Sequence, residues 1–319
     1  MLHTILFQNN IICNKIYKIK NIILANKHHT ANGNVATYIP ELKNANRDDL
    51  GICVIDKDNN IYCAGDYTKK FTIQSISKTI VLAMALMDNE WDYVFSKVGM
   101  EPSGDPFNSI MKLETNDTKK PCNPMINAGA IVTTSLIKGK NLQEKEERML
   151  AFFRKLAKND TLEINQSVYK SEKLTGDRNR AMGYLLKNDG FIEGDVEEVL
   201  DLYFKQCSIE VDVVDLARIA LLFANYGVDI ETGERVISEN ISRIVKTFMV
   251  TCGMYDASGE FALKVGIPAK SGVGGGIMAS VPRRMGIGVF GPALDKKGNS
   301  IGGLKVLEDL SRELELNIF

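Results

Sequence analysis

The first part of the chain alternates between short apolar runs and polar breaks. Residues 50–55 and 61–64 are apolar, and Asp56-Lys57-Asp58-Asn59-Asn60 between them is rich in turn-forming residues, so a β-hairpin is expected. Residues 73–87 follow, and after a polar start they are apolar on nearly every side. This pattern predicts a helix buried at the centre of the protein.

The middle of the chain, from about residue 88 to 250, has the spacing of helices separated by loops. Residues 143–158 and 213–225 both show helical periodicity, the first rich in charge and the second in aliphatic side chains. Between them, Gly176-Asp177-Arg178-Asn179 is expected to be a polar loop.

Strand patterns return near the C-terminus. Residues 272–281 and 285–294 are expected strands joined through Pro282-Arg283-Arg284, and an amphipathic helix is expected around 304–316. Strands at both ends with helices between them predict an α+β fold, in which an antiparallel sheet is built from both chain ends beside a helical region.

Composition limits the classes of function. The 319 residues are 45% hydrophobic and 25% charged, as in ordinary globular proteins, and the net charge is −1. This balance gives no reason to expect nucleic acid or an anionic membrane as a partner. No apolar run approaches the length of a membrane span.

The six cysteines are scattered without a C-x-x-C pair, which indicates reduced, mostly buried thiols. The N-terminal segment lacks a basic start, and Gln8, Asn9 and Asn10 interrupt its apolar stretch. It is a poor match to a signal peptide, so a cytoplasmic location is expected.

Only three histidines occur, His3, His28 and His29, all within the first tenth of the chain. The main body therefore has no imidazole for a Ser-His-Asp triad or a histidine metal site. Ser75 and Lys78 lie three residues apart, so on a helix their side chains share a face. Burial would lower the pKa of Lys78 and make it a candidate base.

The S-x-x-K pattern alone is weak, because roughly one chance match is expected in a chain of this length. It recurs at Ser135/Lys138 and Ser167/Lys170, but the Ser75 copy runs into the buried helix. Lys270-Ser271-Gly272-Val273 opens a glycine-rich segment far downstream, where an exposed lysine on an edge strand is the plainer interpretation. Both elements in this order favour a serine/lysine hydrolase of the penicillin-recognising type.

Five blocks of sequence resemble the serine-dependent glutaminase family. They are Phe71–Lys78, Asn123–Ala130, Gly176–Met182, Cys252–Tyr255 and Pro268–Gly276, and the likeness extends from about residue 33 to the end. The resemblance implies a β-lactamase/transpeptidase-like fold with a central all-helical subdomain. It divides the chain into an extension at 1–32, of unknown role, and a glutaminase domain at 33–319. The sheet subdomain would span about 33–80 and 255–319, and the helical subdomain about 81–254.

The same resemblance implies roles for individual residues. Ser75 would be the nucleophile and Lys78 its general base, Tyr255 would assist proton transfer, and Lys270 matches the K-S-G lysine. The amides of Ser75 and Val273 would form the oxyanion hole. The substrate-binding positions, besides Ser75, would be Tyr38, Gln74, Asn127, Glu172, Asn179, Tyr203, Tyr255 and Val273.

The expected reaction is hydrolysis of L-glutamine to L-glutamate and ammonia, without a metal or organic cofactor, by a homodimer or homotetramer. Glu172 is a suitable partner for the substrate ammonium group, although Glu172 as a solvated charge and Tyr203 and Tyr255 as core aromatics are the plainer alternatives. A β-lactamase, transpeptidase or esterase stays open, although the chain has no Ser-Asp-Asn triplet. So does a non-catalytic ligand sensor on the same fold.

Overall fold

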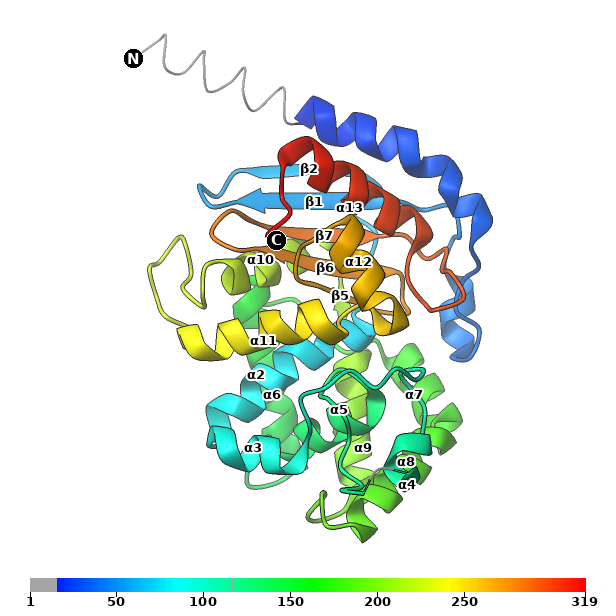
Figure 1. Ribbon diagram of the computed structural model, residues 1–319, viewed down its shortest axis with the longest axis vertical. Coiled ribbons are helices and arrows are strands. Elements are labelled where there is room, and N and C mark those ends of the chain that lie inside the picture. The colour runs from blue at the N-terminus through cyan, green and yellow to red at the C-terminus, as the bar shows by residue number, and fades with distance from the viewer. Residues whose placement is uncertain (1–15, 116) are drawn as a thin grey trace.

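A five-stranded antiparallel sheet forms the upper layer of the molecule (Figure 1). The structure, a computed structural model, describes residues 16–115 and 117–319. The strands run in the order β2-β1-β7-β6-β5. Their bounds are β1 Gly51–Asp56, β2 Ile61–Gly65, β5 Ala269–Ser271, β6 Gly276–Val281 and β7 Met285–Phe290. β1 pairs with β7 from Gly51↔Phe290 to Asp56↔Met285, so the prediction of a sheet built from both chain ends is confirmed.

Helices cover both faces of this sheet. On one face lie α13 (Ile301–Leu314), α12 (Ser258–Lys264) and a helix at residues 16–26 that continues into the 3₁₀ helix η1 (Lys27–Asn32). Ile19, Ile22 and Ile23 of the N-terminal helix are buried in the same apolar cluster as the sheet. One face of the segment 16–32 therefore packs into the core, while residues 1–15 lie outside the described part of the chain.

The opposite face packs against α10 (Val213–Ala224), a helix that comes from the middle of the sequence. Gly286 and Gly288 of β7 make this contact possible. A Cβ atom at Gly286 would overlap the Ala217 carbonyl oxygen, and one at Gly288 would overlap that of Val213. Two glycines thus let the helix backbone lie directly on the strand.

A helical region forms the lower half of the molecule (Figure 1). Its helices are α2 Ser77–Asp88, α3 Trp91–Lys97, α4 Met111–Thr115, α5 Asn127–Ser135, α6 Leu142–Ala157, α7 Gln166–Thr175, α8 Asp177–Asn188, α9 Val196–Cys207 and α11 Glu239–Cys252. Residues 77–86 of α2 are all buried, as the apolar pattern predicted. The helix thus runs through the centre of the protein, with α5, α6 and α11 packed around it.

Several shorter elements complete the fold. β3 (Phe71–Thr72) pairs with β4 (Glu210–Val211) outside the main sheet, and the 3₁₀ turn η3 (Gln74–Ile76) leads from β3 into α2. A second 3₁₀ turn, η4 (Tyr255–Ala257), follows α11, and a third, η2 (Pro40–Asn44), lies near α7.

Two local predictions were wrong. The segment 176–179 is not a loop: α8 begins at Asp177, directly after Gly176, so Asn179 lies in the first helical turn. The expected strand at 272–281 begins only at Gly276, because residues 272–275 form a turn closed by a hydrogen bond from Gly275 N to Gly272 O. In both places tertiary packing decides the local structure, which is a helix start at Asp177 and a turn at 272–275, and the local composition gave no sign of it.

The expectation of reduced thiols throughout was also wrong. Cys53 and Cys63 lie opposite each other in the register of β1 and β2 and form a disulfide. Their separation of ten residues gave no motif, because strand register and not spacing brings them together.

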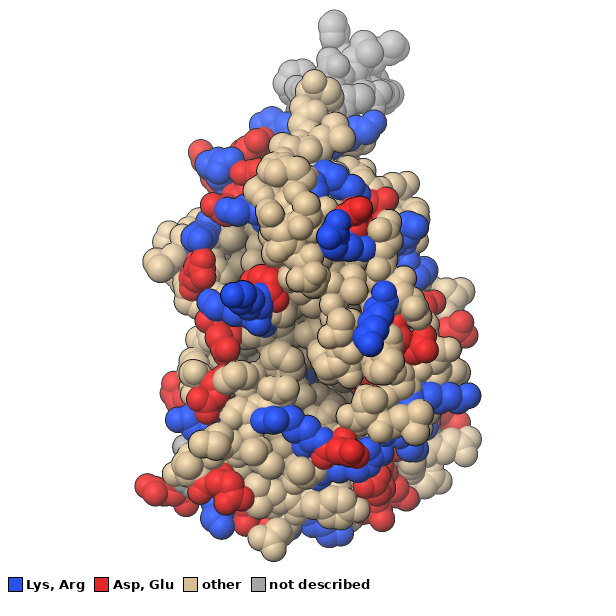
Figure 2. All heavy atoms as spheres, turned by 90° about the vertical axis from the view of Figure 1, so that its right-hand side faces the viewer, with Lys and Arg blue, Asp and Glu red and all other residues tan. Residues whose placement is uncertain are grey.

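The surface carries charges of both signs. On the face drawn in Figure 2, lysine and arginine side chains alternate with aspartate and glutamate. Within residues 16–115 and 117–319, no helix is long and apolar enough to cross a membrane.

The packing of α10 on β7 gives a test of stability. Gly288→Ala should destabilise the protein by about 2 kcal/mol or more, because the added methyl group overlaps the Val213 carbonyl oxygen. Urea unfolding measures the change. Gly259→Ala in α12 is the control, because a methyl group there meets no described atom within 4 Å and alanine favours helix. Equal stabilities for the two variants would contradict the close approach of helix and strand.

Candidate active site

Ser75 lies at the junction between the sheet layer and the helical region. It sits in η3, immediately before α2, and only 6% of it is exposed. The residue before it, Gln74, has φ of +50°, a left-handed conformation that is costly for a residue with a side chain. This strained turn replaces the expected first turn of a regular α-helix and holds the serine at the edge of a cavity.

Lys78 is fully buried one turn later, in α2. Its Nζ atom donates to Asn127 Oδ1 at 2.7 Å and to the Met125 carbonyl oxygen at 3.2 Å. Burial lowers the pKa of Lys78 to about 8, although the nearby Cys207 and Glu172 favour the charged form. With this pKa, roughly a tenth of the amine is neutral at pH 7, far more than for an exposed lysine.

The Lys270 segment packs backbone to backbone against the serine turn. A Cβ at Gly272 would lie 2.8 Å from Ile73 O, and one at Gly274 would lie 2.6 Å from Thr72 O. The glycines at these contacts bring Val273 close to Ser75, with its amide near the Tyr255 hydroxyl. The two predicted elements thus meet, although they are almost 200 residues apart in sequence.

Lys270 itself is not the exposed edge-strand lysine of the plainer interpretation. It is completely buried, its Nζ donates to Ser271 O at 2.7 Å, and that atom lies 4.3 Å from the centre of the Tyr255 ring. Burial lowers its pKa well below the usual value, and the neighbouring Lys78 lowers it further. Two buried amines therefore flank the serine region.

Tyr255 also has a left-handed backbone, with φ of +52° in η4. Its hydroxyl is buried and has no hydrogen bond of ordinary geometry within the described residues. Burial raises its pKa, while the Ser75 side chain and the Val273 amide lie close enough to offset part of the effect. The phenol is thus a neutral, available donor and acceptor beside the serine hydroxyl.

A cavity of about 240 Å³ opens beside Ser75. This is slightly smaller than the ~300 Å³ at which drug-sized ligand pockets begin, so it suits a ligand the size of an amino acid. The predicted site residues that line it are Tyr38, Gln74, Ser75, Asn127, Glu172, Asn179 and Tyr203.

Glu172 is the buried carboxylate of this cavity. It lies on α7 with 6% of its surface exposed, so it is not a solvated loop charge. Burial raises its pKa to about 8, against the opposing effects of a hydrogen bond from Gln74 and the charge of Lys78. A carboxylate in this position would gain most from a ligand that brings a positive charge.

Amide and phenol groups complete the lining. Asn127 Nδ2 donates to Asn179 Oδ1 at 3.1 Å, which fixes both amide groups at the meeting of α5 and α8. Tyr203 on α9 is buried, whereas Tyr38 is 54% exposed at the mouth, with its hydroxyl near Tyr255 and Glu172. These groups can donate hydrogen bonds to a ligand carboxylate.

The other S-x-x-K copies lie elsewhere. Lys138 is exposed, and so are Ser167 and Lys170. Ser77 is the nearest competing serine, but it is completely buried and its hydroxyl donates to Gln74 O at 2.7 Å. Burial and cavity lining thus single out Ser75.

Sequence reasoning missed several residues of the cavity, among them Phe107 and Cys207. Phe107 lines it, with its ring 4.7 Å from that of Tyr255 and 5.9 Å from Lys78 Nζ. A lone aromatic in the polar stretch 101–109 was a signal that could have found it. Cys207 lines the same cavity, with Sγ 4.0 Å from Ser77 Oγ, but a scattered cysteine gave no such signal.

The sheet, the helical region and the buried Ser75/Lys78 pair together define a protein of the β-lactamase-like fold. Comparison with known proteins identifies the particular family. The glutaminase family model matches residues 33–319. The chain is 78% identical to the glutaminase of Clostridioides difficile (strain 630) over 301 residues, which covers 94% of this chain and 97% of that one.

Solved structures agree with this match. A covalent complex between a Bacillus subtilis glutaminase and 5-oxo-L-norleucine is 40% identical, with a TM-score of 0.88, and the match covers 96% of this chain and all of that one. The protein Mglu in its glutamate form is 36% identical, with a TM-score of 0.90, over 95% of this chain and 69% of that one. The chain belongs to the glutaminase family and is an amide-hydrolysing enzyme.

Glu172 provides a test of ligand recognition. The prediction is that Glu172 pairs with the ammonium group of the substrate, so Glu172→Gln should raise KM for an α-amino acid substrate by about 100-fold with a smaller effect on kcat. Steady-state kinetics measures the change. Asp177→Asn is the control, since the Asp177 side chain is 93% exposed and should alter KM less than about twofold. Equal effects of the two substitutions would exclude Glu172 as the ammonium partner.

Proposed function

We propose that this enzyme hydrolyses L-glutamine to L-glutamate and ammonia through a γ-glutamyl ester of Ser75. The observation that carries the proposal is the fully buried Lys78 amine one helical turn from Ser75, with its two hydrogen bonds already directed to oxygen acceptors. The covalent complex of the Bacillus subtilis relative with 5-oxo-L-norleucine supports a protein nucleophile that bonds covalently to a ligand in this cavity.

The contacts of Lys78 suit a general base. A neutral amine has two N–H donors and one lone pair. Met125 O and Asn127 Oδ1 accept both donors, which leaves the lone pair for the Ser75 proton. The serine oxygen then attacks the carboxamide carbon of glutamine, and the amides of Ser75 and Val273 donate to the oxyanion that forms.

Collapse of the tetrahedral intermediate expels ammonia. The proton that Lys78 has taken up returns to the leaving nitrogen, and the Tyr255 hydroxyl, close to Ser75, assists that transfer. Lys270 lies against the Tyr255 ring, and burial together with the charge of Lys78 lowers its pKa, which favours the neutral amine beside the phenol. Water then attacks the ester by the same steps, with Lys78 again as base, and glutamate leaves.

Recognition of glutamine relies on charge pairing at the far end of the cavity. Glu172 binds the α-ammonium group, aided by Gln74, which contacts Glu172 and holds the strained turn. Asn127, Asn179 and the hydroxyls of Tyr38 and Tyr203 supply donors for the α-carboxylate. A substrate that leaves these buried groups unpaired is rejected by the cost of desolvation.

The remaining expectations stay predictions: a homodimer or homotetramer, a cytoplasmic location, and no requirement for a cofactor, nucleic acid or membrane. The β-lactamase, transpeptidase, esterase and sensor alternatives have no observation in their favour. The division into a sheet subdomain and a helical subdomain also stays a prediction, and α10, from the helical stretch, packs on the sheet.

Product release tests the proposal. Ammonia and glutamate are measured with L-glutamine, L-asparagine and nitrocefin as parallel substrates. Selective release from L-glutamine should fall at least about 10⁴-fold in Ser75→Ala, because the substitution removes the hydroxyl that forms the ester.

Ser77→Ala is the matched control. It removes one buried hydroxyl from the same turn and costs about one hydrogen bond, so it should retain activity within about tenfold. Near-normal turnover by Ser75→Ala, or loss only in Ser77→Ala, would refute the assignment. Turnover of nitrocefin without glutamine hydrolysis would move the enzyme to the β-lactam-recognising class.

A further inference from the structure

Two of the groups that contact the Lys78 amine come from one short segment. The Met125 carbonyl oxygen and the Asn127 side chain both accept hydrogen bonds from Lys78 Nζ, and they lie just before and at the start of α5. The Asn127 backbone amide donates to Phe107 O at 2.9 Å. The position of this segment therefore decides where the Lys78 amine points.

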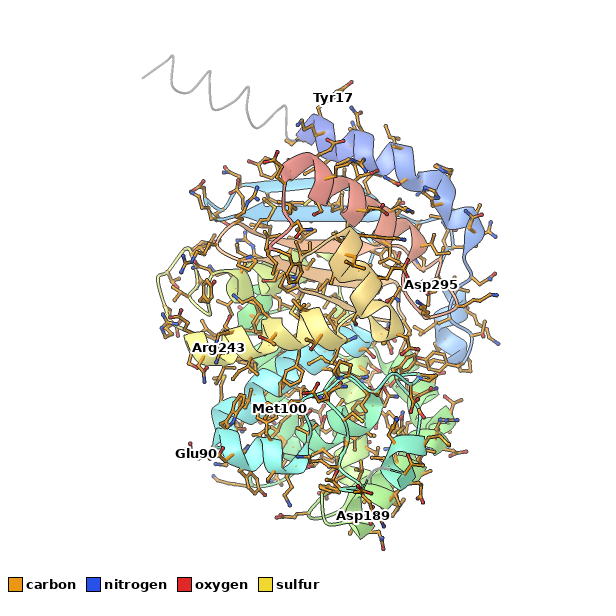
Figure 3. All side chains as sticks on the ribbon, viewed as in Figure 1. Tyr17, Glu90, Met100, Asp189, Arg243 and Asp295 are labelled. Carbon is orange, nitrogen blue, oxygen red and sulfur yellow. A yellow bond between two sulfur atoms is a disulfide. The ribbon has the colours of Figure 1, made fainter. Side chains whose placement is uncertain are left out.

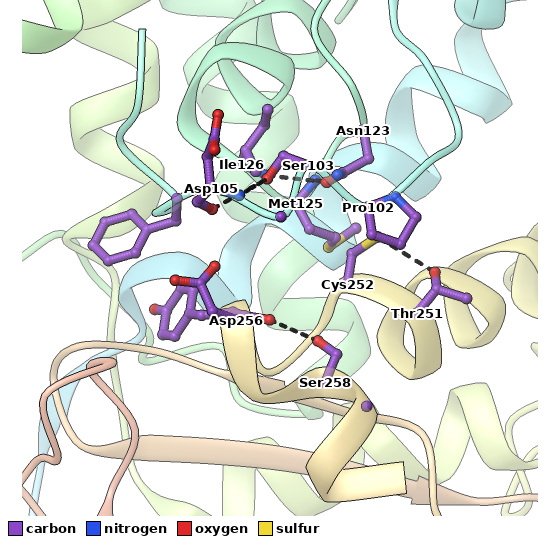
Figure 4. A pocket seen from close by; sticks show the side chains of 14 residues that line it. Pro102, Ser103, Asp105, Asn123, Met125, Ile126, Thr251, Cys252, Asp256 and Ser258 are labelled. Carbon is purple, nitrogen blue, oxygen red and sulfur yellow. Dashed lines mark hydrogen bonds between the residues drawn. The ribbon is translucent and has the colours of Figure 1, made fainter. Parts of the chain in front are cut away.

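Asn123 holds that segment. It is 1% exposed, and its Oδ1 accepts hydrogen bonds from the backbone amides of Met125 at 2.9 Å and Ile126 at 3.2 Å. Its Nδ2 donates to Glu101 O at 2.9 Å. Figure 4 shows Asn123 close to Met125 and Ile126, at the wall of a second cavity.

The helix is also pressed against this residue. A Cβ atom at Gly129, within α5, would overlap the Asn123 carbonyl oxygen, so the segment and the helix lie in direct backbone contact. With the side chain clasping two amides and the main chain touching the helix, Met125 O has little freedom to move. Because a base must be aligned to within a fraction of an ångström, this fixation affects the rate.

We infer that Asn123 is a positioning residue for the reaction: it fixes Met125 and Asn127 so that the Lys78 lone pair is directed at Ser75. The inference rests on the proposed Ser75/Lys78 mechanism. Asn123 does not line the substrate cavity, so it acts through the segment that carries Met125 and Asn127.

Two substitutions of Asn123 test this role, and they should shift the pKa of Lys78 in opposite directions. Asn123→Ala removes these side-chain hydrogen bonds and should lower kcat about 10- to 100-fold. KM for L-glutamine should rise by a smaller factor, because Asn127 on the same segment also lines the substrate cavity. Asn123→Asp keeps an acceptor for both amides but loses the donor to Glu101 O, so it should recover part of the lost kcat. Its added negative charge favours the ammonium form of Lys78, whereas loss of fixed acceptors in Asn123→Ala disfavours it.

The pH dependence of kcat separates positioning from simple loss of stability. The acidic limb, which reports deprotonation of Lys78 in the substrate complex, should move to higher pH in Asn123→Asp and to lower pH in Asn123→Ala. The other titratable groups that act on or beside Lys78 are Glu172 on α7, Cys207 on α9, Lys270 on β5 and Tyr255 on η4, and they are the same in all variants.

Asn89 provides a matched control. Its Nδ2 donates to Ala85 O and Leu136 O, both at 2.9 Å, and so it clasps the other end of the same helix pair, α2 and α5. The neighbouring Glu90 lies at the outer edge of the helical region in Figure 3. Asn89→Ala should lower the melting temperature but leave kcat per folded enzyme and the acidic limb unchanged.

The full panel is wild type, Ser75→Ala, Asn89→Ala, Asn123→Ala and Asn123→Asp, with folded protein quantified by near-ultraviolet circular dichroism. The inference is supported if the acidic limb of the kcat profile moves to higher pH in Asn123→Asp and if the kcat of this variant exceeds that of folded Asn123→Ala. The inference would be overturned if the folded Asn123 variants kept the kcat of Asn89→Ala and an unshifted acidic limb. In that case the proposed function would still stand, provided that turnover disappears in Ser75→Ala. Retained turnover in Ser75→Ala would instead defeat the proposed function.

Discussion

Complete burial of the Lys78 amine is the constraint on which the rest of the site depends. Burying an isolated ammonium group costs free energy, so burial lowers the pKa of Lys78 to about 8 and makes the neutral amine more accessible. The same burial requires that both N–H donors find acceptors, and Asn127 and Met125 provide them. The need to satisfy a buried amine thus also orients it.

The architecture supplies that environment by joining distant parts of the chain. Helix α2 runs through the protein centre, and β3 and η3 connect it to the sheet layer. Gly272 and Gly274 let the Lys270 segment lie against the serine turn, and Gln74 and Tyr255 both hold left-handed backbones beside the serine. Strained backbone conformations at Gln74 and Tyr255 are typical of sites where the surrounding structure holds side chains in fixed positions.

Local pattern was enough to predict the elements that bury a continuous apolar face. The hairpin, the central helix, α6, α10 and α13 all follow from periodicity, because their side chains meet the core in a regular order. The disulfide, the turn at 272–275 and the helix start at Asp177 were missed, since register and packing decide them. Within the site, the resemblance proposed Ser75, Lys78 and Glu172, but nothing in the sequence indicated the clasp made by Asn123, which depends on a contact between segments.

The central claim is that Ser75 becomes covalently acylated during turnover, and rapid quenching tests it most directly. The enzyme is mixed with excess L-glutamine, stopped in acid within one turnover and digested for mass spectrometry. The account predicts that the peptide carrying Ser75 gains the mass of glutamine less ammonia, and that Ser75→Ala shows no such gain. An enzyme that releases ammonia in a single turnover without any such adduct, or with the adduct on another residue, would contradict it.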